Sequence, residues 1–239
     1  MKGIFLIATV LFIGLSIFAQ SYILNNNLYK DLRFEVRGKY TRAITKGKLS
    51  KAKSLEDIIP YYAHNWISDY ISVEIWAYCD GIARKGMGPN DFLNVEQKDI
   101  LNTIDLGSEL IINVNYTYNN PFTDSTEHNS MNIVMTVVPE IEAEYKAGPQ
   151  AMIEYLEENA MDKISDSTLN YIQQWAVLFT VNEKGKITNA KISMSTGDAK
   201  TDSLFLEAIN NMPEWKPAET REGKKVKQEF VFRIGNRGC

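Results

Sequence analysis

Hydrophobic and polar residues alternate along several short stretches of the chain, and this period of two predicts half-buried β-strands. Leu32 to Tyr40 is the first such stretch, and Val226 to Ile234 near the end is the most regular. Between these two, strands are predicted over segments rich in β-branched and aromatic residues, namely Ile71 to Cys79, Glu109 to Tyr118, Met131 to Val138, Trp175 to Val181 and Ile187 to Met194. The pattern therefore favours a strand-rich protein.

Three segments carry their apolar residues at helical spacing instead. The first is Val95 to Thr103, where Asn94 can cap the helix and Gln97, at the third helical position, can answer it. A second helix is predicted to open at Gly148-Pro149, because Pro is tolerated in a first turn. A third covers Asp202 to Met212.

Turn chemistry and the order of elements divide the chain. Asp80-Gly81, followed by Gly86, Gly88 and Pro89, predicts turns between the strand Ile71 to Cys79 and the helix that begins after Asn94. After Pro139 the order becomes helix, strand, strand, helix, strand. We therefore predict an α+β fold in which a strand-rich α+β domain over residues 21–139 is followed by a second domain over residues 140–239.

The first residues have the layout of a secretory signal peptide. Met1 and Lys2 form a short basic start, Ile4 to Leu15 is almost wholly apolar, and Ser16 to Ser21 turns small and polar. Cleavage is expected near Ala19 or Gln20, which makes residues 1–20 the signal and places the mature chain in the periplasm. The alternative is an uncleaved inner-membrane anchor through residues 4–18.

The charge of the chain argues against one class of partner, and its two cysteines leave two pairing states open. The 239 residues contain 26 basic and 30 acidic side chains, and this net charge of -4 argues against a nucleic-acid partner. The basic stretch Lys46 to Lys53 fits either an anionic partner or a solvated loop or helix start. Cys79 and Cys239 could form one bridge after export, or could remain a buried thiol and a free one.

Three short motifs after residue 140, in the right order with the predicted helices between them, resemble the TonB C-terminal domain family. Val177 to Asn189 is similar to the family's first hairpin, and Met212 to Ala218 is similar to its Met-Pro-x-Trp-x-Pro signature. Gly223-Lys224, followed by the last strand, resembles its Gly-Lys-x-Val segment. The residues that carry the resemblance as motif or core positions are Gly185, Met212, Pro213, Trp215, Pro217 and Gly223.

The resemblance implies a three-stranded antiparallel sheet whose last strand has an open edge. A partner segment would add to that edge, a mode in which backbone hydrogen bonds give affinity. The expected binding residues are those of the last strand, namely Val226, Lys227, Gln228, Glu229, Phe230, Val231, Phe232, Arg233 and Ile234. Lys227, Glu229 and Arg233 would lie on its outer face and tune the choice of partner. The implied partners are outer-membrane receptors of the TonB-dependent kind or other envelope proteins, and a homodimer is also possible.

The chain departs from the family in two respects. Asp162 to Gln174 lacks the Tyr-Pro pair that members carry before the first strand, and no long Pro-rich spacer is present. In the first domain, Ile71 to Gly81, Asn90 to Gly107 and Ile111 to Tyr116 are similar to domains of gliding and secretion proteins from Bacteroidetes-type bacteria. The resemblance thus implies a gripping module without the machinery that delivers force.

Catalytic patterns are scarce. His64 and His128 have no Cys or His neighbour at metal-ligand spacing, and no phosphate-cradling Gly motif or nucleophile elbow occurs. Glu140, Glu142 and Glu144 could supply paired carboxylates or form an exposed acidic approach to the next helix. We therefore expect a non-enzymatic binding protein without cofactor or metal. The alternatives are a structural or assembly protein of the envelope and, less favoured, an envelope hydrolase.

Overall fold

The structure is a computed structural model that describes residues 32–59, 62, 65–165, 168–169, 172 and 174–236. The signal-peptide prediction, as well as His64 and Cys239, lies outside these residues. Within them, no helix has the length and apolar character that crossing a membrane requires.

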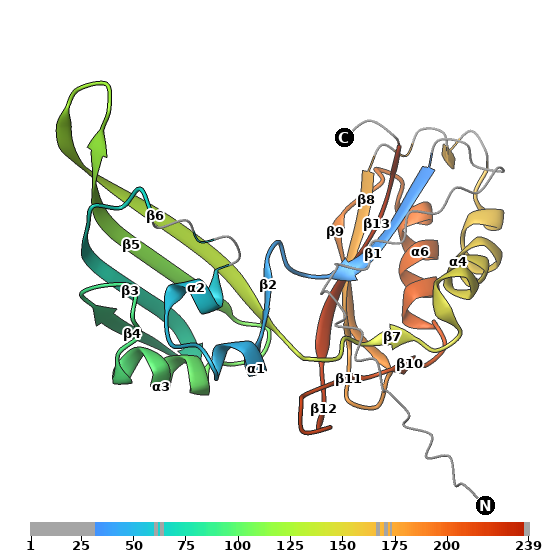
Figure 1. Ribbon diagram of the computed structural model, residues 1–239. Helices are drawn as coiled ribbons and strands as arrows, with labels where there is room; N and C mark the ends of the chain where they lie inside the picture. The colour runs from blue at the N-terminus through green and yellow to red at the C-terminus, as the bar shows by residue number, and fades with distance from the viewer. Residues whose placement is uncertain are drawn as a thin grey trace, which may run out of the picture.

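The described chain is mixed α+β and forms two lobes, each built on its own antiparallel-rich sheet with helices on one face (Figure 1). The first lobe holds a five-stranded sheet in the order β2-β6-β5-β3-β4. Its elements are β2 Ala43–Thr45, α1 Lys46–Leu49, α2 Leu55–Ile58, β3 Asp69–Cys79, β4 Ile82–Gly88, α3 Val95–Thr103, β5 Glu109–Asn120 and β6 Ser125–Val138.

The helices of the first lobe cover one face of this sheet. Alternate residues of β3, such as Val73 and Ile75, are fully buried and share one hydrophobic core with Leu49 of α1, Leu55 of α2 and Ile100 of α3. The opposite face of the sheet carries no helix in the described chain (Figure 1). The lobe therefore has a covered face and an open face.

Helix α3 seats closely on the sheet because β4 is glycine-rich. A Cβ atom on Gly88 would lie 2.8 Å from Gln97 Oε1, and one on Gly86 would lie 3.0 Å from Ile100 Cδ1. The prediction of a turn at these two glycines is wrong, since both belong to β4, and their missing side chains make room for the helix.

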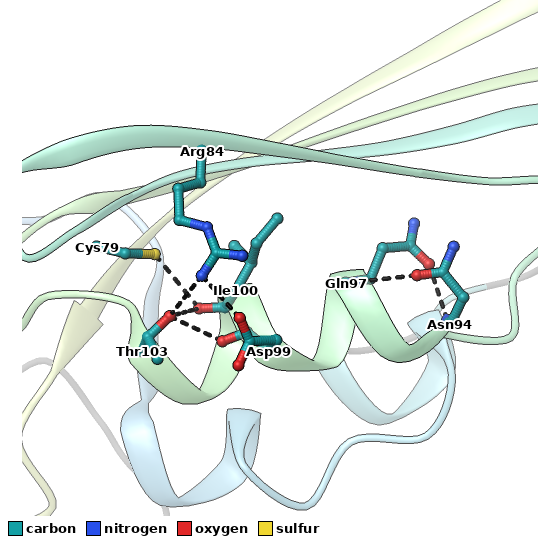
Figure 2. A network of polar contacts seen from close by, with 7 residues as sticks. All are labelled: Cys79, Arg84, Asn94, Gln97, Asp99, Ile100 and Thr103. Carbon is teal, nitrogen blue, oxygen red and sulfur yellow. Dashed lines mark hydrogen bonds and ion pairs between the residues drawn. The ribbon is translucent and has the colours of Figure 1, made fainter.

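The predicted cap of α3 is confirmed (Figure 2). Asn94 Oδ1 accepts from the Gln97 backbone N–H at 2.9 Å, while Gln97 Oε1 accepts from the Asn94 N–H at 3.0 Å. Gln97 is fully buried, and its Nε2 donates to the Val73 carbonyl at 3.0 Å. One side chain thus caps the helix and ties it to β3.

The second lobe contains β1 and the elements that follow residue 138. Its main elements after that residue come in the order helix, strand, strand, helix, strand, and short paired strands lie between them. Its four-stranded sheet has the order β1-β13-β8-β9, and α4 and α6 cover one face (Figure 1). The elements are β1 Leu32–Gly38, β7 Glu144–Tyr145, α4 Gly148–Asn159, a 3-10 turn Met161–Lys163, β8 Gln174–Val181, β9 Ile187–Met194, α6 Ala199–Asn210, β10 Trp215–Lys216, β11 Ala218–Glu219, β12 Lys225–Val226 and β13 Gln228–Asn236.

Two expectations about this lobe are corrected. The sheet has four strands rather than three, because β1 from the start of the described chain joins it. The boundary at residue 139 also separates β1 from the sheet to which it belongs, since Val36 is buried in the core of the second lobe. The first lobe, residues 43–138, is therefore inserted between the first strand of the second lobe and the rest of it.

We predict that Gln97→Met lowers the free energy of unfolding by about 1–3 kcal/mol, because a buried Val73 carbonyl and the Asn94 N–H lose their partner. Lys98→Met, at an exposed neighbouring position of the same helix, is the matched control and should change stability little. Urea denaturation of both variants provides the measurement, and equal midpoints would show that the Gln97 network contributes nothing.

Candidate binding site at the last strand

The last strand is not an edge. β13 pairs with β8 from Gln228↔Val181 to Gly235↔Gln174, and with β1 from Gly38↔Phe230 to Leu32↔Asn236. The expectation of an open edge along Val226 to Ile234 is therefore wrong for the described chain. Val226 belongs to the separate short strand β12. The chain's own β1 occupies the place at which a partner strand was expected to add.

The predicted alternation along this strand is confirmed. Gln228, Phe230, Phe232 and Ile234 are buried, whereas Glu229 and Arg233 are exposed, as is Lys227 before the strand. Val231 is the exception on the outer face, since it is also buried. The outer carboxylate of Glu229 already has a partner, because Lys39 Nζ lies 2.7 Å from its Oε2.

β1 is joined to the lobe by its backbone ladder with β13. Among its described side chains, Val36 is the buried hydrophobic one, while Glu35 and Arg37 are half-buried and pair with each other at 3.1 Å. Burying one Val side chain stabilises by about 1.5–3 kcal/mol, and each ladder hydrogen bond adds only about 0.5–1.5 kcal/mol net. The large core side chains Trp175, Phe179 and Phe232 come from β8 and β13.

Two of the predicted motif pieces meet in space. The Trp215 N–H donates to the Gly185 carbonyl at 2.8 Å. Gly185 has a φ of +74°, and a Cβ atom there would lie 1.9 Å from the Trp215 carbonyl oxygen. Glycine is therefore required at position 185 both by the backbone conformation and by the approach of a second chain segment.

Trp215 is a core residue. Its ring is buried and lies 5.9 Å from Tyr145, 5.7 Å from Phe179 and 5.1 Å from Phe230, measured between ring centroids. Met212 is also buried. The other motif positions shape the chain around this ring. Pro213 follows α6, Pro217 separates β10 from β11, and Gly223 takes a φ of +76° in the turn before β12.

A partly buried polar cluster joins the two segments that cross between the lobes. Tyr40, just after β1, donates its hydroxyl to Glu142 Oε1 at 2.5 Å, and Gln228 Nε2 donates to Glu142 Oε2 at 2.9 Å. The Ala143 N–H in turn donates to Gln228 Oε1 at 2.8 Å. Burial, followed by the bond to the Glu142 carboxylate, raises the pKa of Tyr40 above its ordinary value. This latch fixes the end of β1 to β13.

The three carboxylates considered as catalytic candidates are all engaged in such contacts. Glu140 accepts from the Gly47 N–H of the first lobe at 2.6 Å and from the Arg221 N–H of the second at 3.1 Å. Glu142 belongs to the latch, and Glu144 pairs with Lys216. Each carboxylate therefore serves a different structural bond, rather than forming a pair.

Other sequence candidates lie apart from the last strand. His128 is exposed on β6, and Cys79 is a buried free thiol whose Sγ donates to the Ile100 carbonyl at 3.6 Å. In the part of the chain that the structure describes, no three His, Cys, Asp or Glu side chains are grouped to hold a metal ion. Lys46, from the basic stretch, begins α1 and lines a cleft of about 480 Å³ between the lobes together with Glu140 and Arg221.

Sequence reasoning missed the covering strand and the latch. The alternation of Leu32 to Tyr40 indicated a strand but gave no sign of its partner, which lies at the other end of the chain. Gln228 was assigned to the inner face, where it is indeed buried, but its bonds to the crossing segment follow only from the fold.

Comparisons with known proteins found no relative of this chain. No protein-family model matches the chain, no curated protein matches its sequence, and no solved structure matches its fold.

We predict that Gly185→Ala lowers the free energy of unfolding by roughly 2–5 kcal/mol, because it adds a backbone clash to the strain of a positive φ. Gly197→Ala is the matched control. Gly197 has a φ of +89° but open space around its Cβ position, so only the strain of roughly 1–2 kcal/mol should appear. Thermal or urea unfolding compares the two, and an equal loss would argue against the Gly185–Trp215 approach.

We predict that Tyr40→Phe lowers stability by about 1 kcal/mol at neutral pH through loss of the bond to Glu142. The folded-state pKa of Tyr40 is raised, so its contribution is complete below about pH 10, the pKa of an unfolded tyrosine. It is then lost as pH rises through the folded-state pKa. The difference between wild type and variant should therefore be constant from pH 7 to 9 and shrink above pH 10. A difference that grows at alkaline pH would contradict this assignment.

Proposed function

We propose that the protein is a non-enzymatic binding protein of the periplasm, related to the TonB C-terminal domain, which accepts an extended segment of an envelope protein on β13. The order of α4, β8, β9, α6 and β13 supports this relation. So does the meeting of Gly185 with Trp215, which joins two of the motif pieces on which the resemblance rests. The layout of residues 1–20 supports export.

The single observation that carries the proposal is the way in which β1 fills the edge of β13. A strand paired through its backbone can exchange with another strand of similar shape, because the ladder of hydrogen bonds does not depend on side-chain identity. In this mechanism β1 is a resident strand, and a partner segment replaces it. The core formed by α4, α6, β8 and β13 remains packed during the exchange.

The partners in this proposal are outer-membrane receptors of the TonB-dependent kind or other envelope proteins. A second copy of the chain is also a possible donor, since an exchanged β1 would produce a domain-swapped homodimer. Arg233, which lies opposite Glu35 of β1, and Lys227, just before β13, are exposed and would contribute to the choice of partner.

The second candidate is a structural or assembly protein of the envelope, in which β1 stays in place. The Tyr40–Glu142–Gln228 latch favours this alternative, because it anchors the residue that follows β1. Hydrogen exchange separates the two functions. Protection along β1 equal to that of β8 favours permanent coverage, whereas early exchange of β1 alone favours a replaceable strand.

Strand exchange is tested with a disulfide tether. Glu35 and Arg233 lie directly opposite each other in the β1–β13 register, a position in which Cβ atoms are close enough for a bridge. We predict that Glu35→Cys with Arg233→Cys, in a Cys239→Ser background, blocks binding of a fluorescent peptide of residues 31–39 when oxidised. Binding should return on reduction, because β1 is then free to leave.

The control for the tether is Glu35→Cys alone in the same background, which should bind the peptide under both redox conditions. Fluorescence anisotropy supplies the measurement, and capture of envelope proteins by the oxidised and reduced forms extends it to natural partners. Equal peptide binding by the oxidised and reduced tether would contradict exchange at β13.

A further inference from the structure

The first lobe carries a strand edge of its own. β4 is the terminal strand of the five-stranded sheet, and within the described chain it has a neighbour, β3, on one side only. Its seven residues contain no proline, so their backbone geometry suits pairing. Such an edge is a template for another strand unless something covers it.

Helix α3 covers the face of β4 and not its edge. The Cβ directions at Gly86 and Gly88 point at Gln97 and Ile100, and Cβ atoms project perpendicular to the sheet. The helix therefore packs against the face of the strand, and Figure 2 shows Arg84 reaching from β4 to Asp99 and Thr103 of the helix. One edge contact comes from Asn94, whose Nδ2 donates to the Met87 carbonyl at 2.8 Å close to the end of β4.

Exposed hydrophobic side chains gather around this edge. Of the twelve large hydrophobic residues that are exposed in the described chain, six lie on β4, on the residues of β3 that pair with it, or between β4 and the first residue of α3, that residue included. They are Trp76, Tyr78, Ile82, Met87, Phe92 and Val95. Scattered single residues of this kind are ordinary, but a concentration beside one unpaired strand marks an interaction surface.

The charges of β4 decide between two kinds of occupant. β4 bears Lys85 and Arg84 and no acidic residue, and Arg84 pairs with Asp99 of α3 at 2.8 Å. An antiparallel pairing of β4 with a second copy, centred on Lys85, would place the two Lys85 side chains opposite each other, and like charges in that position destabilise the pair. A segment of another protein with a carboxylate beside Lys85 would instead be favoured. The pairing of Lys85 Nζ with Glu74 Oε2 at 3.0 Å, across β3 and β4, is a local example of that contact.

The pattern of the open face specifies the segment further. Ala83, Lys85 and Met87 are exposed together on this face, and Lys85 Nζ lies 5.2 Å from the centroid of the Trp76 ring. We propose that the edge of β4 binds an extended segment of another protein that has a carboxylate at one position and apolar side chains two residues before and after it. This surface lies in the first lobe and is independent of strand exchange at β13.

The probe is a synthetic peptide of sequence Thr-Leu-Thr-Glu-Thr-Leu-Thr, compared with the same peptide carrying Lys in place of Glu. The full chain should bind the Glu peptide about threefold to fivefold more tightly than the Lys peptide. The dissociation constants are measured by titrating each peptide into isotope-labelled protein and following the NMR signals of the β4 amides. Lys85→Glu should reverse this preference. A second variant, Glu74→Lys with Lys85→Glu, retains an ion pair and should show the same reversal, which guards against simple misfolding.

Three outcomes would overturn the proposal. The first is equal binding of both peptides, and the second is a preference that neither variant changes. The third is a concentration-dependent dimer, detected by sedimentation, that is lost in the Lys85→Glu variant, since this would identify a second copy as the occupant. The oxidised Glu35→Cys, Arg233→Cys tether should leave peptide binding unchanged. Loss of binding in the tether would place the peptide at β13, so failure here is distinguishable from failure of the proposed function.

Discussion

The pairing of β1 with β13 is the constraint on which the rest of this structure depends. A strand edge carries backbone groups that need partners, and this chain supplies the partner for its last strand from its own beginning. Because the whole first lobe is built between these two strands, the chain must leave the second lobe after Gly38 and return before Ile141. The two crossing segments therefore lie beside each other. Tyr40 from one segment and Glu142 from the other form a partly buried cluster with Gln228 of β13.

The junction between the lobes follows from this arrangement. Glu140 accepts one backbone N–H from each lobe, at Gly47 and at Arg221, so a single carboxylate spans the boundary. Ile141 pairs with Glu219 on the side of the second lobe, which holds the returning segment against that lobe. The alternating acidic residues Glu140 and Glu142 thus accept hydrogen bonds from different parts of the chain, Glu140 from both lobes and Glu142 from Tyr40 and Gln228.

The sequence predicted local structure well and long-range pairing poorly. The bounds of α3 and β9 agree with those predicted, because caps, turns and periodicity depend on neighbouring residues. Gly86 and Gly88 were misread because a glycine that makes room for a helix looks the same in sequence as one that makes a turn. The covering strand β1 was found as a strand, but its partner depends on the topology of the whole chain. For the candidate site, the sequence predicted which side chains of the last strand point into the core and which point outward. It could not predict that β1 pairs with the edge of that strand.

The insertion of one lobe within the other also orders the events of folding. Residues 43–138 form a core with contacts among themselves, so this lobe can be completed as soon as its own chain has been made. The sheet of the second lobe cannot be completed so early. Lys39 and Glu229 are 190 residues apart, and the loop that joins them must close before β1 can pair with β13. Folding of the inserted lobe brings Ala43 beside Thr136, which closes the first part of that loop. The chain that still has to close, from the end of the first lobe to β13, is shorter, so less conformational entropy is lost when β1 pairs with β13.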